Sequence, residues 1–456
     1  MSNRAIDDEY SFLQQELTSY LSDGGRLAVV KAPPGSGKTY ALIEVLAALA
    51  GEGSCIAVAA QTNNQCDDIC SRIARSHPGI SVYRFASRAN RPPPNFPPTV
   101  SWVVDKALLP SGPSITVATT AKWALTDLAA PFDLLAVDEA WQMGWADLMQ
   151  CATLSSRFML IGDPGQIPPV VTIDVRRWET SPRAPHKAAP EIVLGEPELA
   201  GVIFEGSLPA CRRLPHEAVE FVKPFYDFDF VAYQAPGTRG VDLPENHPWH
   251  VLGDGRPIAL TVPTPSAGPP IEVDHQLAEA AAVVVTDLLT SGANVRDGQG
   301  SSRPLEAADI GVCSTHRVMN AALTSQLLQW VPQVRVDTPE RWQGLERPVM
   351  IVVHPLSGVT RPSAFDLETG RLCVMASRQQ AALILLARDH IGETLSNYIP
   401  SADQAPGRPD VVGRGHDAHL RFWRTLLEQD RVIPLSSSGE AADSADIAIA
   451  TLPNGG

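Results

Sequence analysis

The stretch that most constrains this chain runs from Val29 to Leu46 and reads VVKAPPGSGKTYALIEVL. A short apolar run at residues 26–30 predicts a buried strand, and residues 38–50 are apolar at helical spacing. Between them, residues 32–39 fit the pattern of a phosphate-binding loop, with Ala32 at the first glycine position. A strand, a glycine-rich turn and a helix in this order predict an α/β fold built on a parallel sheet.

The residue types in this turn indicate what it binds. Glycines let backbone N–H groups turn inward around an anion, and the helix N-terminus adds positive potential. Lys38 is expected to reach the β and γ phosphates of a nucleotide, and Thr39 to offer a hydroxyl to Mg²⁺. The loop therefore predicts nucleoside triphosphate binding, with contacts from Pro34, Gly35, Ser36, Gly37, Lys38, Thr39 and Tyr40.

Two later segments carry polar residues at the ends of apolar runs. Residues 132–142 read FDLLAVDEAWQ, and the acidic pair at the end of this predicted strand belongs beside the phosphate loop. Asp138 is suited to hold Mg²⁺, and Glu139 to orient and deprotonate an attacking water. In GDPGQIPP, residues 162–169, Gln166 is a candidate sensor of the γ phosphate.

Charge and composition limit how this chain could bind nucleic acid and indicate the cellular compartment in which it works. The net charge is −15 and the pI about 5.2, so bulk charge would not hold this chain on nucleic acid and any such binding needs a local groove. Seven scattered cysteines without zinc spacing are typical of reduced thiols in a cytosolic protein. The start is polar and acidic, unlike a secretion signal, and no apolar run reaches the roughly 18 residues of a membrane span. We expect a cytoplasmic protein.

These elements, in this order, resemble the motifs of superfamily 1 helicases, most closely those of the Upf1-like branch. In the first half the similar segments are residues 32–39, 57–69, 115–125, 137–142 and 162–169. In the second half they are residues 208–226, 309–320, 336–353 and 371–385. The resemblance covers roughly residues 10–390.

The resemblance implies roles for residues of the second half. Arg212 and Arg378 match the two arginines that approach the γ phosphate, although Arg213 is a neighbouring rival for the first. Gly344 and Glu346 match the segment that contacts the nucleotide, with Glu346 on the ribose. Where the family has an adenine-stacking aromatic residue, this chain has Cys211, and either Gln14 or Gln15 is expected to recognise the adenine.

The resemblance also implies two tandem RecA-like P-loop domains with parallel central sheets and an ATP cleft between them. ATP and Mg²⁺ would close the cleft, and loss of the γ phosphate would let it open. A single nucleic-acid strand, DNA or RNA, would lie across both domains. The implied strand contacts are Thr62, Asn63, Thr119, Thr120, His316 and Arg317.

Proline-rich and polar stretches suggest the domain organisation. We expect a first domain at residues 1–172 with a small insertion at about 77–113, a linker at 173–190 and a second domain at 191–400. Residues 401–456 are expected to form a C-terminal extension with an amphipathic helix at 416–430, which docks on the body of the chain or on a partner protein, followed by a flexible acidic tail.

The leading hypothesis is an ATP-hydrolysing helicase or translocase on single-stranded nucleic acid, moving 5′→3′ as the branch does. The alternative is a nucleic-acid-stimulated ATPase that clamps or remodels nucleoprotein complexes without unwinding, as a subunit of a defence or repair system. Two further classes stay open, a P-loop kinase or small-molecule NTPase and a regulatory subunit that binds ATP.

Overall fold

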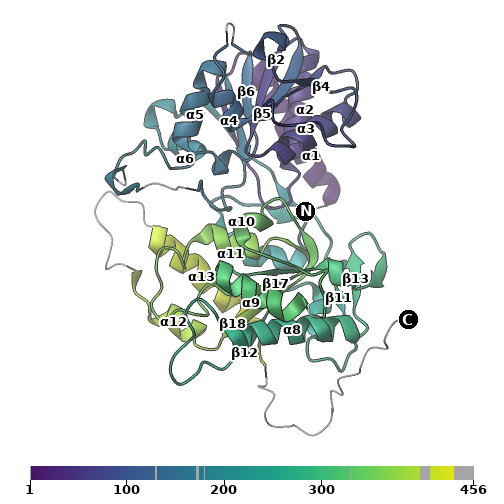
Figure 1. Cartoon of the computed structure of the whole chain (residues 1–456), viewed down its shortest axis with the longest axis vertical. Coiled ribbons are helices and arrows are strands. Elements are labelled where there is room, and N and C mark those ends of the chain that lie inside the picture. The colour runs from purple at the N-terminus through teal and green to yellow at the C-terminus, as the bar shows by residue number, and fades with distance from the viewer. Residues whose placement is uncertain are drawn as a thin grey trace.

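The computed structural model describes residues 2–128, 131–170, 174–178, 180–328, 330–400 and 411–435. Two α/β domains are stacked along the long axis of the molecule, the first half of the chain forming the upper one in Figure 1. Each domain is built on a parallel sheet. The predicted class, two tandem RecA-like domains, is therefore confirmed. The predicted flexible tail lies outside the described residues.

The first domain contains an eight-stranded parallel sheet in the order β4-β3-β5-β2-β6-β7-β1-β8. Its strands are β1 (Leu27–Lys31), β2 (Cys55–Ala60), β3 (Val82–Phe85), β4 (Ser101–Val103), β5 (Ser114–Thr119), β6 (Leu134–Val137), β7 (Phe158–Gly162) and β8 (Ile203–Ser207). Its helices are α1 (Asn3–Ser22), α2 (Lys38–Gly51), α3 (Asn63–Ser76), α4 (Thr120–Ala124), α5 (Trp145–Cys151) and α6 (Ala189–Leu194).

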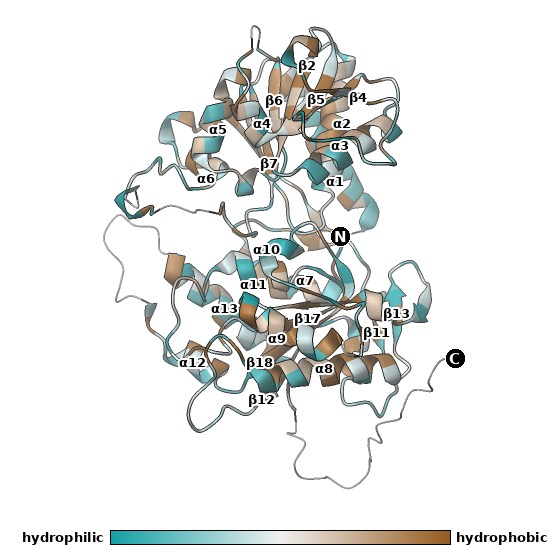
Figure 2. Cartoon of the chain, viewed as in Figure 1, coloured by the Kyte–Doolittle hydropathy of each residue, from teal (hydrophilic) through white to brown (hydrophobic). Residues whose placement is uncertain are grey.

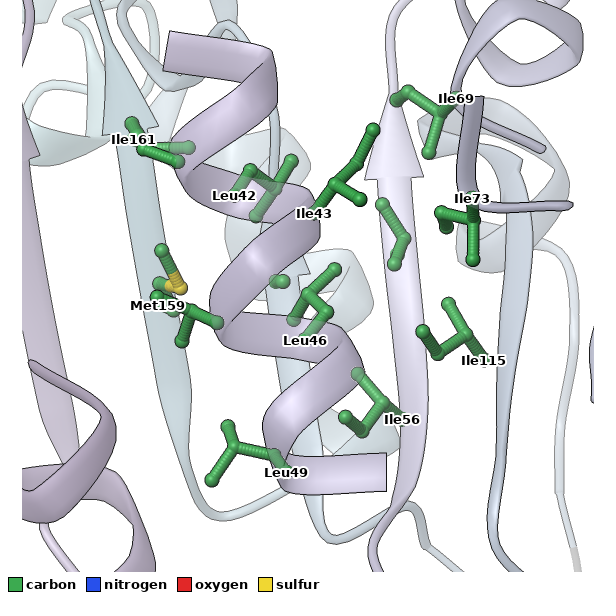
Figure 3. Close-up of a cluster of buried hydrophobic side chains, with 14 of the residues drawn as sticks. Leu42, Ile43, Leu46, Leu49, Ile56, Ile69, Ile73, Ile115, Met159 and Ile161 are labelled. Carbon is green, nitrogen blue, oxygen red and sulfur yellow. The ribbon is translucent and has the colours of Figure 1, made fainter. Parts of the chain in front are cut away.

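Alternating residues of the strands supply two hydrophobic layers. One face packs against α1, α2 and α3, and the other against α4, α5 and α6. Figure 3 shows Leu42, Ile43, Leu46 and Leu49 of α2 facing Ile56 and Met159 on the sheet. Burial of a Leu or Ile side chain stabilises the fold by about 1.5–3 kcal/mol, so this contact holds the start of α2 firmly beside β1.

The expected insertion at residues 77–113 is part of the sheet instead. Both β3 and β4 lie within it, and they extend the sheet in parallel beyond β5. Prolines in the connection between them obscured two short strands, because they punctuate the sequence with turn signals.

The first domain also extends beyond the expected boundary at residue 172. Strand β8 pairs in parallel with β1, and Ala189 and Val193 of α6 belong to the first domain's core. The chain crosses to the second domain after Ser207, not at residue 191. A short edge strand such as β8, half-buried except for the exposed Glu205, carries little periodic signal in the sequence.

The second domain contains a six-stranded parallel sheet in the order β16-β15-β17-β18-β12-β19, with two small accessory sheets. Its strands are β9 (Ala210–Cys211), β10 (Val231–Ala232), β11 (Arg239–Asp242), β12 (Ile258–Val262), β13 (Asn294–Asp297), β14 (Ser302–Pro304), β15 (Ile310–Cys313), β16 (Arg335–Asp337), β17 (Arg347–Val353), β18 (Gln379–Arg388) and β19 (Val432–Pro434). Its helices are α7 (Val219–Val222), α8 (His275–Thr290), α9 (Arg317–Leu328), α10 (Pro339–Trp342), α11 (Thr369–Met375), α12 (Ile391–Asn397) and α13 (Val411–Glu428).

Hydropathy follows this architecture. Figure 2 shows predominantly hydrophobic central strands in both domains, with more polar residues on the outer helices. Among the described residues, no helix combines the length and the apolar character that crossing a membrane would require.

The expected C-terminal extension is an integral part of the second domain. Phe422, Trp423 and Leu426 of α13 are buried in its core, and the following β19 pairs with β12. Of the two alternatives for its apolar face, the body of the chain or a partner, the structure shows the first. Helix α13 also covers the segment before α11, because a Cβ on Gly415 would lie 2.0 Å from the carbonyl oxygen of Leu367.

We therefore expect Gly415→Ala to destabilise the second domain by about 1–3 kcal/mol, the usual cost of overpacking. A loss of stability would be informative, because helix propensity alone favours alanine over glycine inside a helix by about 1 kcal/mol and would raise the stability. Thermal unfolding measures the change. The control is Gly51→Ala at the end of α2, where a Cβ meets nothing within 4 Å. An unchanged or raised melting temperature for Gly415→Ala would contradict this close packing.

Candidate active site

The phosphate loop links the C-terminal end of β1 to the N-terminal end of α2 as the sequence predicted. Gly35 and Gly37 have positive φ angles of 60° and 84°, which side chains rarely adopt. Lys38 and Thr39 open α2, both half-buried, and Ser36 is buried. The hydroxyl of Ser36 has no hydrogen-bond partner in the described part of the chain. This cradle of backbone N–H groups and a free hydroxyl fits a phosphate group.

Three carboxylates surround the ammonium of Lys38. Its Nζ lies 2.6 Å from Oε1 of Glu139, and the charges of Asp163 and Asp138 also act on it. Burial lowers the pKa of Lys38, but these carboxylates outweigh burial and the pKa is raised overall. Burial and the charge of Glu139 raise the pKa of Asp138 to about 7. Three carboxylates around one cation favour a further cation at this position.

The backbone at Glu139 is unusual. Its φ and ψ angles are 53° and 43°, the left-handed region that costs a non-glycine residue about 1–2 kcal/mol. The preceding carboxylate supports this turn, because Oδ1 of Asp138 accepts a hydrogen bond from the Glu139 N–H at 3.0 Å. The turn aims adjacent side chains, Asp138 and Glu139, at one lysine.

Gln166 belongs to a buried hydrogen-bond network that reaches the second domain. Its Nε2 donates to Asp163 at 3.1 Å, and its Oε1 accepts from Gln142 at 3.3 Å. The hydroxyl of Tyr226 donates to the other oxygen of Asp163 at 2.9 Å. Ile167, the next residue of the loop, is buried in the core of the second domain. The loop after β7 thus joins the two domains.

The structure corrects the first arginine. The guanidinium of Arg212 binds Asp7 of α1 at 2.6 Å and stacks 3.9 Å above the ring of Tyr233. The backbone N–H of Arg212 donates to the carbonyl of Gly35 at 3.1 Å. The side chain of Arg213 lies against the phosphate loop instead, since a Cβ added to Gly35 would lie 2.3 Å from the Cβ of Arg213. A motif alignment that is uncertain by one residue cannot decide which of the two adjacent arginines approaches the phosphate loop.

Arg378 lies at the domain interface, where the charges of Asp163 and Glu139 act on it, and its contact with the γ phosphate remains a prediction. Its side chain is only 2% exposed, and its Nε and Nη2 have no hydrogen-bond partner among the described residues. Burial, then the charge of Arg213, lowers its pKa, while Asp163 and Glu139 oppose this. A buried guanidinium with free donors and a second arginine nearby fits an anion.

Gly344 and Glu346 follow α10 on the second-domain side. Gly344 has a φ of 76°, which favours glycine. Glu346 accepts a hydrogen bond from Arg213 at 2.5 Å and another from Gln380 at 2.7 Å. Its carboxylate therefore orients Arg213 in this structure, and the ribose role remains a prediction.

Neither Gln14 nor Gln15 contacts the phosphate loop among the described residues. Both line a groove between α1 and α2, together with Glu44. Tyr10 of the same helix contacts the phosphate loop, where a glutamine was expected. Its hydroxyl donates to the carbonyl of Gly37 at 3.0 Å, and its ring stacks 6.3 Å from the exposed ring of Tyr40. The glutamines lie about 6 Å or more further along α1, because each residue adds 1.5 Å.

The four expected strand contacts of the first domain have local structural partners. Thr62 and Thr119 cap α3 and α4 through their side-chain oxygens, and Asn63 accepts a hydrogen bond from the buried Arg84 at 2.7 Å. Thr120 is buried, with its hydroxyl 3.4 Å from the carbonyl of Ala60. Thr62 and Asn63 remain exposed at the C-terminal end of β2. Contact of these residues with nucleic acid remains a prediction.

In the second domain, His316 and Arg317 lie at the start of α9. The ring of His316 stacks on Phe365 with centroids 5.6 Å apart, and Arg317 is exposed. His316 also lines a cavity of about 400 Å³ with Ser314, Thr315, Ser357 and Arg361. The lining is mixed, because it also includes the carboxylates of Glu272, Asp274 and Asp366 and several apolar residues. Contact of His316 and Arg317 with nucleic acid remains a prediction.

Sequence reasoning missed Asp163 and Tyr226 and ranked Arg213 second. An aspartate ending an apolar strand was a usable signal for Asp163, since Asp138 was found in that way. Tyr226 had no comparable signal, because its partner is 63 residues away in the chain.

Part of this chain is similar to a known protein family and to a curated protein. Residues 9–177 match the family model AAA_30, described as an AAA domain. DNA replication ATP-dependent helicase/nuclease DNA2 of Saccharomyces cerevisiae is 24% identical over 182 residues, which cover 38% of this chain and 12% of that protein. The chain therefore spans a small part of the length of this curated relative.

Solved structures of Arterivirus nonstructural protein 10, a helicase, align with 81% of this chain and about three fifths of their own. One of these structures is 17% identical, is covered over 61% of its own chain and has a TM-score of 0.42. The complex of this helicase with DNA is 16% identical, is covered over 62% of its own chain and has a TM-score of 0.42. The PRRSV helicase has 13% identity, covers 82% of this chain with 55% of its own, and has a TM-score of 0.41.

Residues 9–177 thus match an AAA domain, and this match covers most of the first of the two parallel-sheet α/β domains.

Proposed function

We propose that this chain hydrolyses ATP between its two domains and uses the cycle to move along single-stranded nucleic acid. The observation that carries the proposal is that the second domain places Arg213 against the phosphate loop at Gly35 and places the buried Arg378 where the charges of Asp163 and of Glu139, the partner of Lys38, act on it. Hydrolysis of a triphosphate needs positive charge on the developing oxygen anions. A pocket completed by both domains makes hydrolysis depend on their closure.

Each residue of the pocket then has a role. The phosphate loop and Lys38 would bind the β and γ phosphates, and Arg213 and Arg378 would stabilise the charge on the γ phosphoryl group. Thr39 and Asp138 would hold Mg²⁺, which neutralises phosphate charge when bound; the surplus of carboxylates around Lys38 fits this cation. Glu139 would orient and deprotonate the attacking water. The base would pack near Tyr10 and Tyr40.

Coupling to motion would run through the loop after β7. Gln166 binds Asp163, whose charge acts on Lys38, and would lie beside the γ phosphate. Ile167 is packed in the second domain, and Tyr226 binds Asp163. A Cβ on Gly370 would lie 2.6 Å from the Gln166 carbonyl, so this contact leaves little room for independent movement. Loss of the γ phosphate at Gln166 would therefore alter the way the domains meet.

The nucleic-acid strand would cross the C-terminal edges of both sheets, from β2 and β5 to the cavity beside His316. Movement from 5′ to 3′ and membership of the Upf1-like branch are part of the proposal. The match to a yeast DNA replication helicase supports action on a nucleic acid.

ATP hydrolysis measured with and without oligo-dT and oligo-U tests the proposal. We expect at least one of these single strands to increase the rate severalfold. Displacement of labelled strands from duplexes with 5′ or 3′ tails then gives polarity, and only the 5′-tailed duplex should open. Stimulation without strand displacement would favour a clamp or remodelling ATPase, and no response to either strand would exclude nucleic acid as the activator.

A further inference from the structure

Two cations lie together at the C-terminal edge of the first sheet, away from the nucleotide. Lys122 is in α4, directly after β5, and Arg88 follows β3, the next strand outward. Strand β3 lies three strands from β6, which carries Asp138. At about 4.8 Å between neighbouring strands, the pair is some 15 Å from the nucleotide chemistry.

The ammonium of Lys122 is held in place without a carboxylate partner. Its Nζ lies 4.0 Å above the ring of the buried Phe85, and the side chain is half-buried. The pKa of Lys122 is lowered, first by burial and then by the positive charge of Arg88; Asp105 opposes this weakly. Asp105 already accepts a hydrogen bond from the backbone of Ala107.

Arg88 is exposed, and within the described ranges its guanidinium makes no ion pair. Other arginines of this domain do have carboxylate partners, since Arg84 binds Asp67 and Arg72 binds Asp68. In a chain with a net charge of −15, carboxylates are plentiful. Two adjacent cations that repel each other and have no acidic partner are therefore an unusual arrangement, and it becomes favourable when an anion lies between them.

We propose that Lys122 and Arg88 together bind a backbone phosphate of single-stranded nucleic acid at this edge of the sheet. The inference rests on the proposed function and extends the strand path outward beyond β5. Phe85 fixes the ammonium from beneath and does not stack on a base, because its ring is 1% exposed.

The position favours nucleic acid over other anions. The C-terminal ends of β2, β5 and β3 lie in sequence along one edge, with the exposed Thr62 and Asn63 between this pair and the nucleotide. A strand following this edge meets a phosphate at each step, and phosphate contacts of this kind set position without reading sequence.

The test compares the double variant Lys122→Met/Arg88→Gln with wild type by fluorescence anisotropy on labelled oligo-dT and oligo-U. Methionine keeps the stem that covers Phe85. Two lost contacts should lower the slope of log affinity against log salt by about 1.4 and weaken binding by about 25-fold at 0.1 M salt. The control, Lys223→Met/Arg421→Gln, removes the same charge from cations paired with Asp229 and Asp417, and should bind as wild type does.

The outcomes separate the two proposals. Wild-type affinity and slope in the double variant would overturn this site and leave the proposed function standing. Failure of the wild-type chain to bind either strand would overturn both. If the double variant does not fold, the single exchange Arg88→Glu on the exposed loop gives the same readout, and Lys122→Arg should retain binding.

Discussion

Replacing Glu139 by glutamine should reduce steady-state ATP hydrolysis by about 10²–10⁴-fold, the usual contribution of a positioned base. The amide keeps the shape of the side chain and can still accept a hydrogen bond from Lys38, 2.6 Å away in the wild-type chain. It cannot take a proton from water. Phosphate release measures turnover, and a fluorescent ATP analogue measures binding.

We expect Glu139→Gln to bind nucleotide at least as tightly as wild type, because one of three carboxylates around the phosphate site loses its charge. Binding of a single strand should also persist. The matched control is Glu198→Gln, at an exposed position of the first domain, which should hydrolyse ATP normally. Normal turnover by Glu139→Gln would remove Glu139 from the reaction.

Arg213→Ala should lower kcat by about 10³-fold or more, the range for an arginine that stabilises phosphoryl transfer. The adjacent Arg212→Ala is the matched comparison, because it removes the same side chain one residue away. The guanidinium of Arg212 binds Asp7 and Tyr233, while its backbone N–H, which alanine retains, donates to the carbonyl of Gly35 in the phosphate loop. We therefore expect loss of the side chain to change kcat by less than about tenfold. Separate measurement of kcat and nucleotide affinity distinguishes the two.

The opposite ranking would restore the assignment implied by the motif alone. Equal and large losses in both variants would show that the whole segment after β9 had shifted, and the thermal unfolding of each variant identifies that case. Arg213 also contacts Glu346 and the carbonyl of Ser377, next to Arg378. Part of the expected loss therefore comes from disturbing a second arginine.

These two variants address different sides of one cleft. Glu139 belongs to the first domain and Arg213 to the second, and the 2.3 Å approach that a Cβ on Gly35 would make to Arg213 shows how closely they meet. If both variants lose turnover but keep nucleotide binding, hydrolysis depends on the domains together.

The sequence by itself determined the parts of this protein that depend on neighbouring residues. The strand, turn and helix around Lys38 were readable because glycines at positive φ and apolar periodicity are local properties. Asp138 and Glu139 were readable for the same reason, since they end an apolar run. The resemblance carried by the order of these elements then implied two tandem α/β domains, and two parallel-sheet domains are observed.

Tertiary structure decided everything that depends on a partner far away in the chain. Arg212 and Arg213 are chemically identical, and only the contact of one with Asp7, 205 residues earlier, separates their roles. Strand β8 became part of the first sheet by pairing with β1, and α13 became core by packing under the second. The free energy of such contacts comes from burial and pairing between distant segments, which no local pattern contains.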